Sequence, residues 1–328
     1  MTKVIGRLSQ IGIGAESTRG TSVASDYTVP VTNIDFDDKV EYADNDSGFG
    51  RIEEKNDAAV IKRWAEGQYE GKIFDQSVGL ELMALFGASP SSAQRTTTGV
   101  YDHTFTLAQN NQHKSLTLSY EDANLDLRYA MAMLNTWSLE LAVDNYARRT
   151  ANFVSKKSAS ASNSMSYVNE NEFIPKDITF KVATDLSGLD GASAIKIRSF
   201  NMEVNKNVEA LYVLGSNEPD DIANKQFAVT GSFEAYFNET TYRDFVLNGS
   251  QKALRIDIVS STIIGNSGTH TPALRFDLAK AKFGEFERGW DSNDIMLQTI
   301  NFEALFSVAD SSMITARLTN AIDGTIYA

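Results

Sequence analysis

The sequence predicts a mainly β protein with short helices, built from two related modules. Many short runs alternate apolar and polar residues and are separated by turn residues, which is typical of antiparallel strands. Residues 71–87 leave a strand-like run and become an apolar helix ending in glycine, and residues 231–249 do the same about 160 positions later. Residues 149–153 (RTANF) are echoed by residues 298–302 (QTINF). Self-similarity at this spacing indicates a duplicated unit.

The composition is that of a folded chain without disulfides. The 328 residues suffice for about two domains, and 42% hydrophobic residues exclude a mainly disordered protein. No apolar run approaches the roughly 20 residues that span a bilayer, and the N-terminus lacks the pattern of a secretory signal. The absence of cysteine excludes thiolate nucleophiles and cysteine-based metal sites. We therefore expect synthesis in the cytosol and no membrane association.

The first half, residues 1–157, begins with an extended arm over 1–32. A long acidic stretch follows at 33–59 and is predicted to be either a disordered insertion or a hairpin that reaches a neighbour. Residues 60–74 read as a strand, and the Asp75-Gln-Ser sequence can cap a helix that Gly87 ends. Further strands are predicted at 101–107, 115–120, 125–129, 136–143 and 149–157.

A serine-rich linker over 158–170 is predicted to separate this half from the second, residues 171–328. In the second half we expect a polar excursion at 207–225 and a helix at 239–247 capped by Asn238. Strands are predicted at 173–182, 195–205, 226–237, 254–259, 273–282, 283–288, 295–308 and 313–318. The pattern favours two β sandwiches or barrels, each with one flanking helix.

No catalytic, cofactor-binding or metal site is predicted. His103, His113 and His270 lack the spacing or acidic neighbours of a zinc or general-base site, and we expect all three at the surface or in loops. No Gly-x-Ser-x-Gly elbow occurs. Residues 44–48 resemble the start of a calcium loop but lack its final glutamate and flanking helices.

Two other residue types are interpreted structurally. Gly12 and Gly14 are not followed by the helix of a dinucleotide site, so they indicate flexible backbone in the N-terminal arm. Trp64, Trp137 and Trp290 are most simply core residues. For Trp290, which lies in a Gly-Trp-Asp-Ser turn, an interface anchor is the alternative.

The charge excludes a groove that grips nucleic acid, because the net charge is −13 and clustered Lys and Arg are needed for such binding. An acidic surface keeps a protein soluble, and it also keeps DNA from adhering. The acidic stretch supplies charges that could pair with an adjacent copy and set its register, or could simply be solvated. These candidate inter-ring or inter-subunit contacts are Asp35, Asp37, Asp38, Lys39, Glu41, Asp44, Asp46, Arg51, Glu53, Glu54 and Lys55.

Over nearly its whole length the chain resembles the tail tube proteins (major tail proteins) of long-tailed, non-contractile, siphovirus-like bacteriophages. The resemblance rests on structural motifs rather than catalytic ones. They are IGAESTRGTS (13–22), VPVTNIDF (29–36), GFGRIE (48–53), WAEGQYEG (64–71), the helix at 75–87, LGSNEPDD (214–221) and VTGSFEAYF (229–237).

The resemblance implies a structural virion protein and not an enzyme, with no cofactor, assembled in the host cytoplasm. Sheets of neighbouring subunits would join into an inner barrel, and rings would stack into a hollow tube through which DNA passes without specific binding. A duplicated chain would need three copies for a six-module ring, with six copies as the alternative. The stretch 33–59 would be the main inter-ring loop, assisted by the arm 1–26. Expected partners are tape-measure, tail terminator and distal tail proteins.

Two other classes stay open at this point. A β-sandwich adhesin or carbohydrate-binding protein could have the same acidic, aromatic, cysteine-free composition. A glycosidase would need two carboxylates facing each other across a cleft, and the sequence singles out no such pair.

Overall fold

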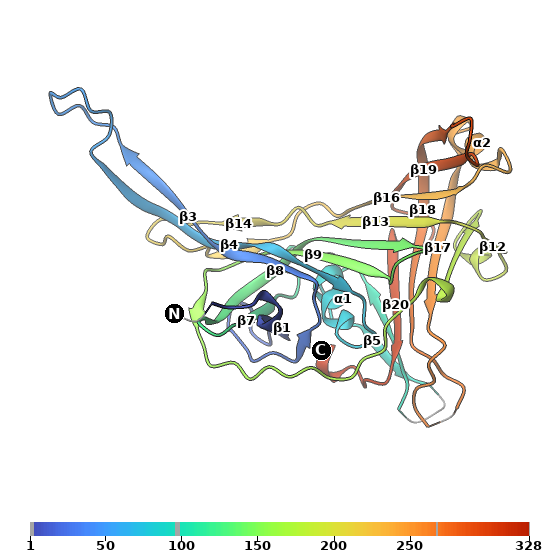
Figure 1. Ribbon diagram of the computed structural model, residues 1–328, viewed down its shortest axis with the longest axis horizontal. Helices are drawn as coiled ribbons and strands as arrows, with labels where there is room; N and C mark the ends of the chain where they lie inside the picture. Colours follow the sequence, from blue (N-terminus) through green and yellow to red (C-terminus); the bar gives the residue numbers. More distant parts are fainter. Residues whose placement is uncertain (1–2, 96–98, 267, 328) are drawn as a thin grey trace.

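The computed structural model describes residues 3–95, 99–266 and 268–327, and it is mainly antiparallel β structure with two short α-helices (Figure 1). The helices are α1 (Val78–Phe86) and α2 (Thr241–Leu247). Neither these nor any other helix in the described part of the chain could span a membrane. The strands are β1 (Gln10–Ala15), β2 (Tyr27–Val29), β3 (Asn33–Asn45), β4 (Asp57–Lys72), β5 (Ser91–Gln94), β6 (Tyr101–Thr106), β7 (Leu116–Glu121), β8 (Asp126–Ala142), β9 (Arg148–Ser155), β10 (Ala159–Ser160), β11 (Ile178–Ala183), β12 (Ala194–Ile195), β13 (Ser199–Asn205), β14 (Glu209–Leu211), β15 (Asp221–Ala223), β16 (Ala228–Tyr236), β17 (Gln251–Val259), β18 (Ala273–Gly289), β19 (Leu297–Ala304) and β20 (Ile314–Asn320).

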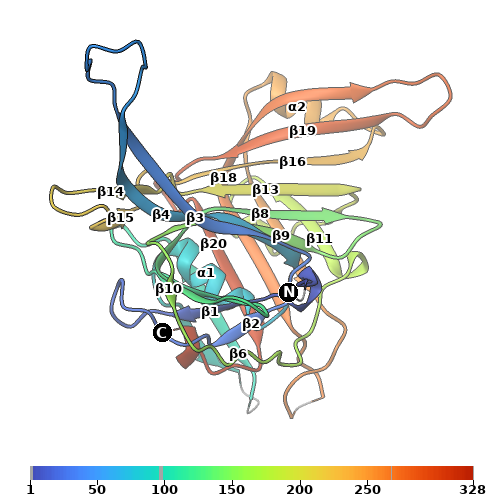
Figure 2. The ribbon, with the colours of Figure 1, turned by 60° about the vertical axis from the view of Figure 1, so that its left-hand side comes forward.

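A continuous antiparallel sheet runs through both halves of the chain in the order β3-β4-β9-β8-β13-β16-β19-β18, and we call it the central sheet. Figure 2 shows its strands stacked from β9 and β8 through β13 and β16 to β19. The pairing of β8 with β13 joins the first half to the second. The two halves therefore share one sheet rather than forming two separate barrels.

Strands β8 and β18 each serve two layers. Their C-terminal parts lie in the central sheet, whereas their N-terminal parts pair with β7 and β10 or with β17 and β20. Each contains a register shift where it pairs with its central-sheet neighbour, near Leu134 in β8 and Phe283 in β18. A bulge bends a strand. Thus the strands predicted at 125–129 and 136–143 are one strand, as are those at 273–282 and 283–288.

The core lies between these layers and is shared by the two halves. Helix α1 is completely buried in it, and the Trp137 ring of the first half packs against Phe276 of the second, with ring centroids 5.6 Å apart. The segment predicted as a linker contains β10, and its Asn163 donates a hydrogen bond to the Leu127 carbonyl at 3.1 Å. The structure therefore shows no separation of the two halves at residues 158–170, and the boundary there stays a prediction.

The ends of the helices agree only in part with the sequence. Gly87 ends α1 with φ = 79°, and its N–H donates to the Met83 carbonyl, as predicted. The predicted side-chain caps are wrong. At α1 the Glu170 carboxylate accepts hydrogen bonds from the Gln76 and Ser77 N–H groups at 3.0 and 2.5 Å, and burial raises its pKa. Helix α2 begins at Thr241, so Asn238 lies too early to cap it.

The sequence aligned Gly71 of the first repeated segment with Gly231 of the second, but the strand pairing aligns Gly231 with a different glycine. Phe153 of β9 lies opposite Gly67 of β4, and Phe302 of β19 lies opposite Gly231 of β16. A Cβ on Gly67 would lie 1.9 Å from the Asp35 carbonyl oxygen, and one on Gly231 would lie 2.2 Å from that of Asn201. Gly67, and not Gly71, therefore takes the place that Gly231 takes in the second half.

Gly67→Ala should lower the free energy of unfolding by roughly 2–5 kcal/mol, because the added Cβ collides with backbone and φ is +149°. Urea unfolding measures the loss. Gly48→Ala is the matched control, since its Cβ meets nothing within 4 Å; it should change the stability by less than about 1 kcal/mol. Equal losses in the two variants would contradict the steric explanation.

Two of the three histidines are buried. His103 lies in β6, so its prediction as a surface or loop residue is wrong, whereas His113 lies in the loop before β7, as predicted, with its ring buried. His103 accepts or donates one bond with Ser92 and one with Asn320, at 2.8 and 3.0 Å. His113 packs against Gly87 at the end of α1, and its Nε2 lies 3.0 Å from the Ala108 carbonyl. Both are brought inside by segments remote in sequence.

The stability should fall between pH 6.5 and about 4. Burial and the charges of Lys206 and Arg19 lower the pKa of His113 to about 4 from its ordinary 6.5. On acidification the unfolded chain binds this proton first, so the contribution of His113 to stability is lost through that window and changes no further below it. The expected loss from this group is roughly 2 kcal/mol, allowing for solvent screening. Urea unfolding at pH 7 and pH 4 should show a smaller difference in His113→Phe than in the original chain.

The N-terminal glycines are close-contact residues and not parts of a flexible arm. Gly12 and Gly14 lie in β1, which pairs with β2 on one side and β7 on the other. A Cβ on Gly14 would lie 2.3 Å from the Ala24 carbonyl oxygen. Residues 10–15 are thus held in the sheet.

Candidate assembly surfaces

The acidic stretch 33–59 is a hairpin, one of the two alternatives that its sequence left open. Strands β3 and β4 pair as far as Asn45 and Asp57, and Figure 1 shows the hairpin projecting far beyond the rest of the molecule. Residues 46–56 form its tip. The tip exposes two large apolar side chains, with Phe49 64% exposed and Ile52 fully exposed. Exposed apolar groups on a projecting element are typical of a contact site.

The predicted contact residues are divided between strand and tip. Asp35, Asp37, Asp38, Lys39, Glu41 and Asp44 lie on β3, whereas Asp46, Arg51, Glu53, Glu54 and Lys55 lie in the tip. Four of them, Asp38, Glu41, Asp44 and Lys55, are held by their own chain. Asp38 accepts from the Ser158 N–H at 2.8 Å, Glu41 pairs with Lys62 at 2.7 Å, and Asp44 pairs with Lys55. Lys39 is half-buried, and the other ten are exposed.

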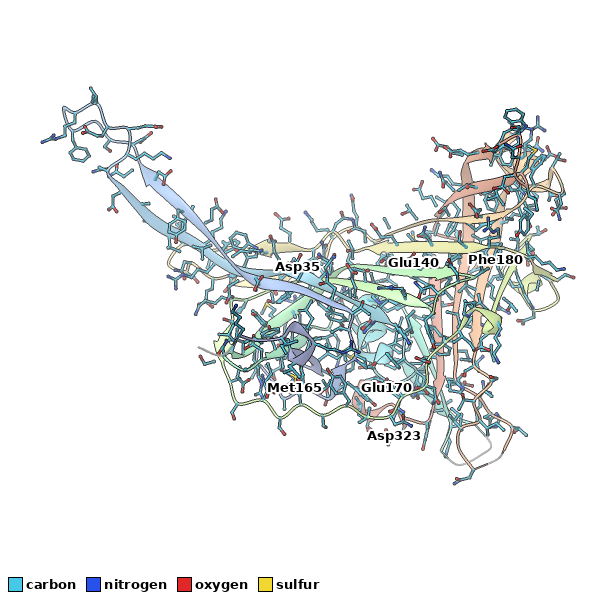
Figure 3. The ribbon with its side chains drawn as sticks, in the orientation of Figure 1. Asp35, Glu140, Met165, Glu170, Phe180 and Asp323 are labelled. Atoms are coloured by element: carbon cyan, nitrogen blue, oxygen red, sulfur yellow. The ribbon has the colours of Figure 1, made fainter. Side chains whose placement is uncertain are left out.

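The face of the central sheet that points away from the core is acidic. Along each strand, residues that alternate with buried ones face outward, as Glu140 does between buried Leu139 and Leu141. Figure 3 shows Asp35 and Glu140 along this sheet, with Glu170 and Asp323 on the opposite side of the molecule. The outward acids are Asp35, Asp37, Glu66, Glu70, Glu140, Glu203, Glu234, Glu285, Glu287 and Glu303. Basic residues on the same strands and face are Lys39, Lys62, Lys72, Arg148 and Lys282, fewer than the acids.

The central sheet has two open edges. In the described part of the chain, β3 pairs only with β4, and residues 283–289 of β18 pair only with β19. Open edges present unpaired N–H and C=O groups to another strand. These edges lie at opposite ends of the sheet.

The β18 edge carries apolar surface. Helix α2 packs on its own half through Tyr242 and through Phe245, whose ring stacks on Phe283 with centroids 5.6 Å apart. Its other side is open, and Leu247 is 65% exposed. Trp290, just beyond β18, is 76% exposed. The core prediction for Trp290 is therefore wrong, because none of the described strands lies beyond this edge of β18 to cover it.

A groove of about 1270 Å³ lies beneath the other edge. Its wall on the β3 side includes Ile34 and Phe36, and its floor includes Leu127 and Tyr129 of β8. The Phe36 and Tyr129 rings meet edge to face with centroids 4.9 Å apart. The groove thus combines these apolar side chains with polar and charged ones, among them Arg7, Asp37, Asp38 and Lys39.

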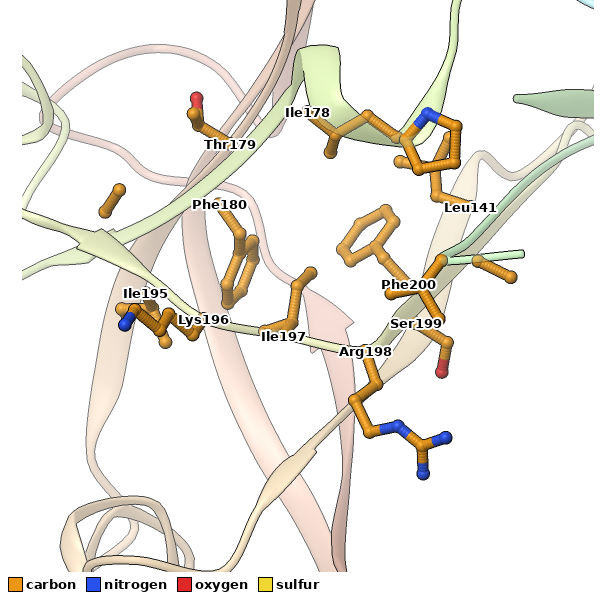
Figure 4. Close-up of a pocket in the computed structure, with 14 residues that line it drawn as sticks. Leu141, Ile178, Thr179, Phe180, Ile195, Lys196, Ile197, Arg198, Ser199 and Phe200 are labelled. Atoms are coloured by element: carbon orange, nitrogen blue, oxygen red, sulfur yellow. The ribbon is translucent and has the colours of Figure 1, made fainter. Parts of the chain in front are cut away.

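A smaller pocket of about 330 Å³ lies where β8 and β13 approach β11 and β12. Figure 4 shows the rings of Phe180 and Phe200 and the side chain of Ile197 around it, while the Arg198 guanidinium points away. Among the residues the structure describes, no group of three or more His, Asp or Glu side chains is placed to hold a metal ion. The calcium-like residues 44–48 are thus not part of such a cluster.

Open strand edges at both ends, an exposed hairpin and an acidic face define a structural protein that assembles with copies of itself. The model of the phage tail tube protein family matches residues 6–304, and the chain belongs to that family. No curated protein matches the chain. It is a non-enzymatic structural component of the phage tail tube in the virion, and its family self-polymerises. This membership replaces the adhesin and glycosidase alternatives.

The sequence offered the hairpin as one of two alternatives, and the predictions included neither the groove nor the α2 edge. The groove is formed by β3, β7 and β8 together, so no single stretch signals it. The signal in the sequence for the α2 edge was Trp290 in a turn, because an exposed tryptophan is typical of a site that a partner covers.

Proposed function

We propose that this chain builds the tail tube of a siphovirus-like, non-contractile phage from trimeric, pseudo-hexameric rings, each chain supplying two duplicated modules. Strand order supports the duplication. Strands β3-β4-β9-β8 of the first half and β13-β16-β19-β18 of the second follow the same order and directions. Strands β1 and β7 likewise correspond to β11 and β17, and a helix follows the second strand of each set.

Register supports the duplication as well. Phe153 lies opposite Gly67 on one side and Leu134 on the other, and Phe302 lies opposite Gly231 and Phe283. The register shift follows directly after the phenylalanine pair in both halves. This agreement favours module ranges close to 1–157 and 171–328.

The number of strands favours three chains over six. Three copies of the eight-stranded central sheet give 24 strands. With strands about 4.8 Å apart and tilted by about 40°, 24 strands close into a barrel of roughly 50 Å diameter at the backbone. This leaves room for a DNA double helix inside the side chains. Six copies would double the diameter, far beyond what one duplex needs.

The acidic face supports a lumen along which DNA slides. If the central sheets close with this face inward, carboxylates such as Glu140, Glu203 and Glu66 line the channel. These carboxylates repel the phosphate backbone of DNA. Few Lys or Arg side chains lie on this face to replace the counterions of DNA and bind it. DNA would then pass without a sticking free energy. A tube map with a neutral or basic inner wall would contradict this part of the proposal.

The hairpin supports stacking of rings. Its tip projects from one end of the strands, so a contact with the next ring is heterologous and propagates as a filament. Exposed tip residues, including Arg51, Glu53 and Glu54, would set the register by charge, and Phe49 and Ile52 would supply apolar contact. Tape-measure, terminator and distal tail proteins would fill the lumen and close the ends, after assembly in the host cytoplasm.

The single observation that carries the proposal is the continuous sheet with an open edge at each end. Electron microscopy of concentrated protein tests it: negative stain should show hollow tubes, and a cryo-EM map should show three chains per ring. A map with six chains per ring would overturn the trimer, and a strictly monomeric protein at all concentrations would overturn ring assembly.

A further inference from the structure

We propose that α2 and the open β18 edge of one copy dock into the groove beneath β3 of the next copy, with β18 pairing to β3 as β8 pairs to β13 within the chain. This rests on the proposed ring. It adds the strands, the helix and the register that would join one subunit to the next.

The precedent is the junction between the two halves of one chain. There β8 pairs with β13, setting Leu139 opposite Met202. Helix α1 and the β8 edge pack on the second half, since Trp137 contacts Phe276. The buried Lys206, just after β13, donates to the Ala84 carbonyl of α1 at 2.6 Å. A helix and a strand edge of one module thus fill the space beneath the first strand of the next module.

The groove beneath β3 is the same space without an occupant. Its Ile34 and Phe36 take the places of Phe200 and Met202 of β13, counting from the glycine pairs. On its floor Leu127 and Tyr129 of β8 take the places of Phe276 and Leu278 of β18, which form part of the buried core beside α1. Among the described residues no strand pairs with the second edge of β3, and this groove is open.

The occupant is matched to the groove in the same way. Helix α2 corresponds to α1, yet α1 is wholly buried and α2 has only Tyr242 buried. Phe286 takes the place of Trp137, and the exposed Trp290 takes that of Leu141. Docking would cover Trp290 and Leu247, two large apolar side chains that this edge exposes.

The register follows from the correspondence. Within the chain Ser138 lies opposite Glu203, and Glu140 lies opposite Asn201. Transferred to two copies, Glu287 lies opposite Asp37, and Gly289 lies opposite Asp35. The same register sets Glu285 opposite Lys39, a favourable pair, while Glu287 and Asp37 are a like-charged pair on the acidic face.

Disulfide trapping tests the register, because the chain has no cysteine of its own. In Asp37→Cys/Glu287→Cys, opposed residues on adjacent strands lie within disulfide reach, and the exchange also removes the like-charged pair. Oxidation of assembled protein should give covalent dimers and closed trimers on non-reducing gels. The matched control is Asp37→Cys/Thr299→Cys. Thr299 is the β19 partner of Glu287, one strand farther away and out of reach.

The outcomes separate this proposal from the proposed function. Tubes that form normally without a covalent trimer in the Asp37/Glu287 variant would overturn the register while the tube function stands. Cross-linking equal to that of the Thr299 control would overturn it too. Ser138→Cys/Glu203→Cys, an opposed pair within the chain, must close inside single chains and shows that the oxidation works.

A second variant tests the helix. Leu247→Glu places a charge on the exposed side of α2 and should reduce ring formation at least tenfold, while the monomer keeps its unfolding midpoint because the side chain is exposed. Ile263→Glu, also exposed but in the β17–β18 loop, should assemble normally. Unchanged assembly of Leu247→Glu, in protein that unfolds at the original midpoint, would remove α2 from the interface.

Discussion

Arg149→Leu should lower the free energy of unfolding by about 3–5 kcal/mol, the largest stability loss that we expect from one substitution. The Glu81 carboxylate of α1 is fully buried and accepts hydrogen bonds from Arg149 Nε at 2.6 Å, Trp137 Nε1 at 2.8 Å and the Tyr69 hydroxyl at 3.1 Å. Removing the guanidinium leaves a buried carboxylate without its counter-charge. Urea unfolding followed by tryptophan fluorescence measures the loss.

A double variant separates the ion pair from simple packing. Arg149→Leu/Glu81→Leu removes both charges and should recover part of the loss, because replacing both partners leaves no charge unpaired. Lys225→Ala is the control for a surface pair, since Lys225 and Glu209 are each about half exposed, and it should cost less than about 1 kcal/mol. If the double variant is less stable than Arg149→Leu, the buried charge is not the cause.

This network also shows what the sequence could and could not predict. Alternation placed most strands within a few residues, because a strand with one face in the core must alternate. The sequence also predicted that Trp137 lies in the core and that Glu81 lies in a helix, as two independent predictions. Alternation does not name a partner, however, so the meeting of Arg149 with Glu81, 68 positions apart, was not predictable. The same limit hid the pairing of β8 with β13, which turns two expected barrels into one sheet.

Burial of the two helices was equally hidden. The segments of α1 and α2 were predicted as equivalent, and each is a short helix that follows a strand of the central sheet. One is buried by Tyr327 and Phe105 from remote parts of the chain and the other has an open side. His113 lies in a loop, as its polar neighbours suggest, but its local sequence could not show that the end of α1 covers its ring. Of the candidate contact residues, the sequence located the hairpin and its charges, but the partner surfaces depend on the assembled fold.

Replacing the hairpin tip, residues 46–56, by Asn-Gly should abolish tubes and leave folded protein. Asn45 and Asp57 are already paired, so a two-residue turn closes the strands without strain. Every residue removed is exposed, and we expect the free energy of unfolding to change by less than about 1 kcal/mol. Negative-stain microscopy and sedimentation velocity should show rings or monomers in place of tubes.

A point variant shows which part of the tip makes the contact. Phe49→Ser/Ile52→Ser keeps the backbone and all charges of the tip but removes its exposed apolar side chains. If apolar contact drives stacking, this variant should behave like the tip replacement; if the charges suffice, it should form tubes that dissociate at high salt. Normal tubes from the tip replacement itself would contradict the inter-ring assignment. The two interfaces are then distinguishable, because loss of the tip stops stacking after rings have closed, whereas Leu247→Glu stops the closure of the ring.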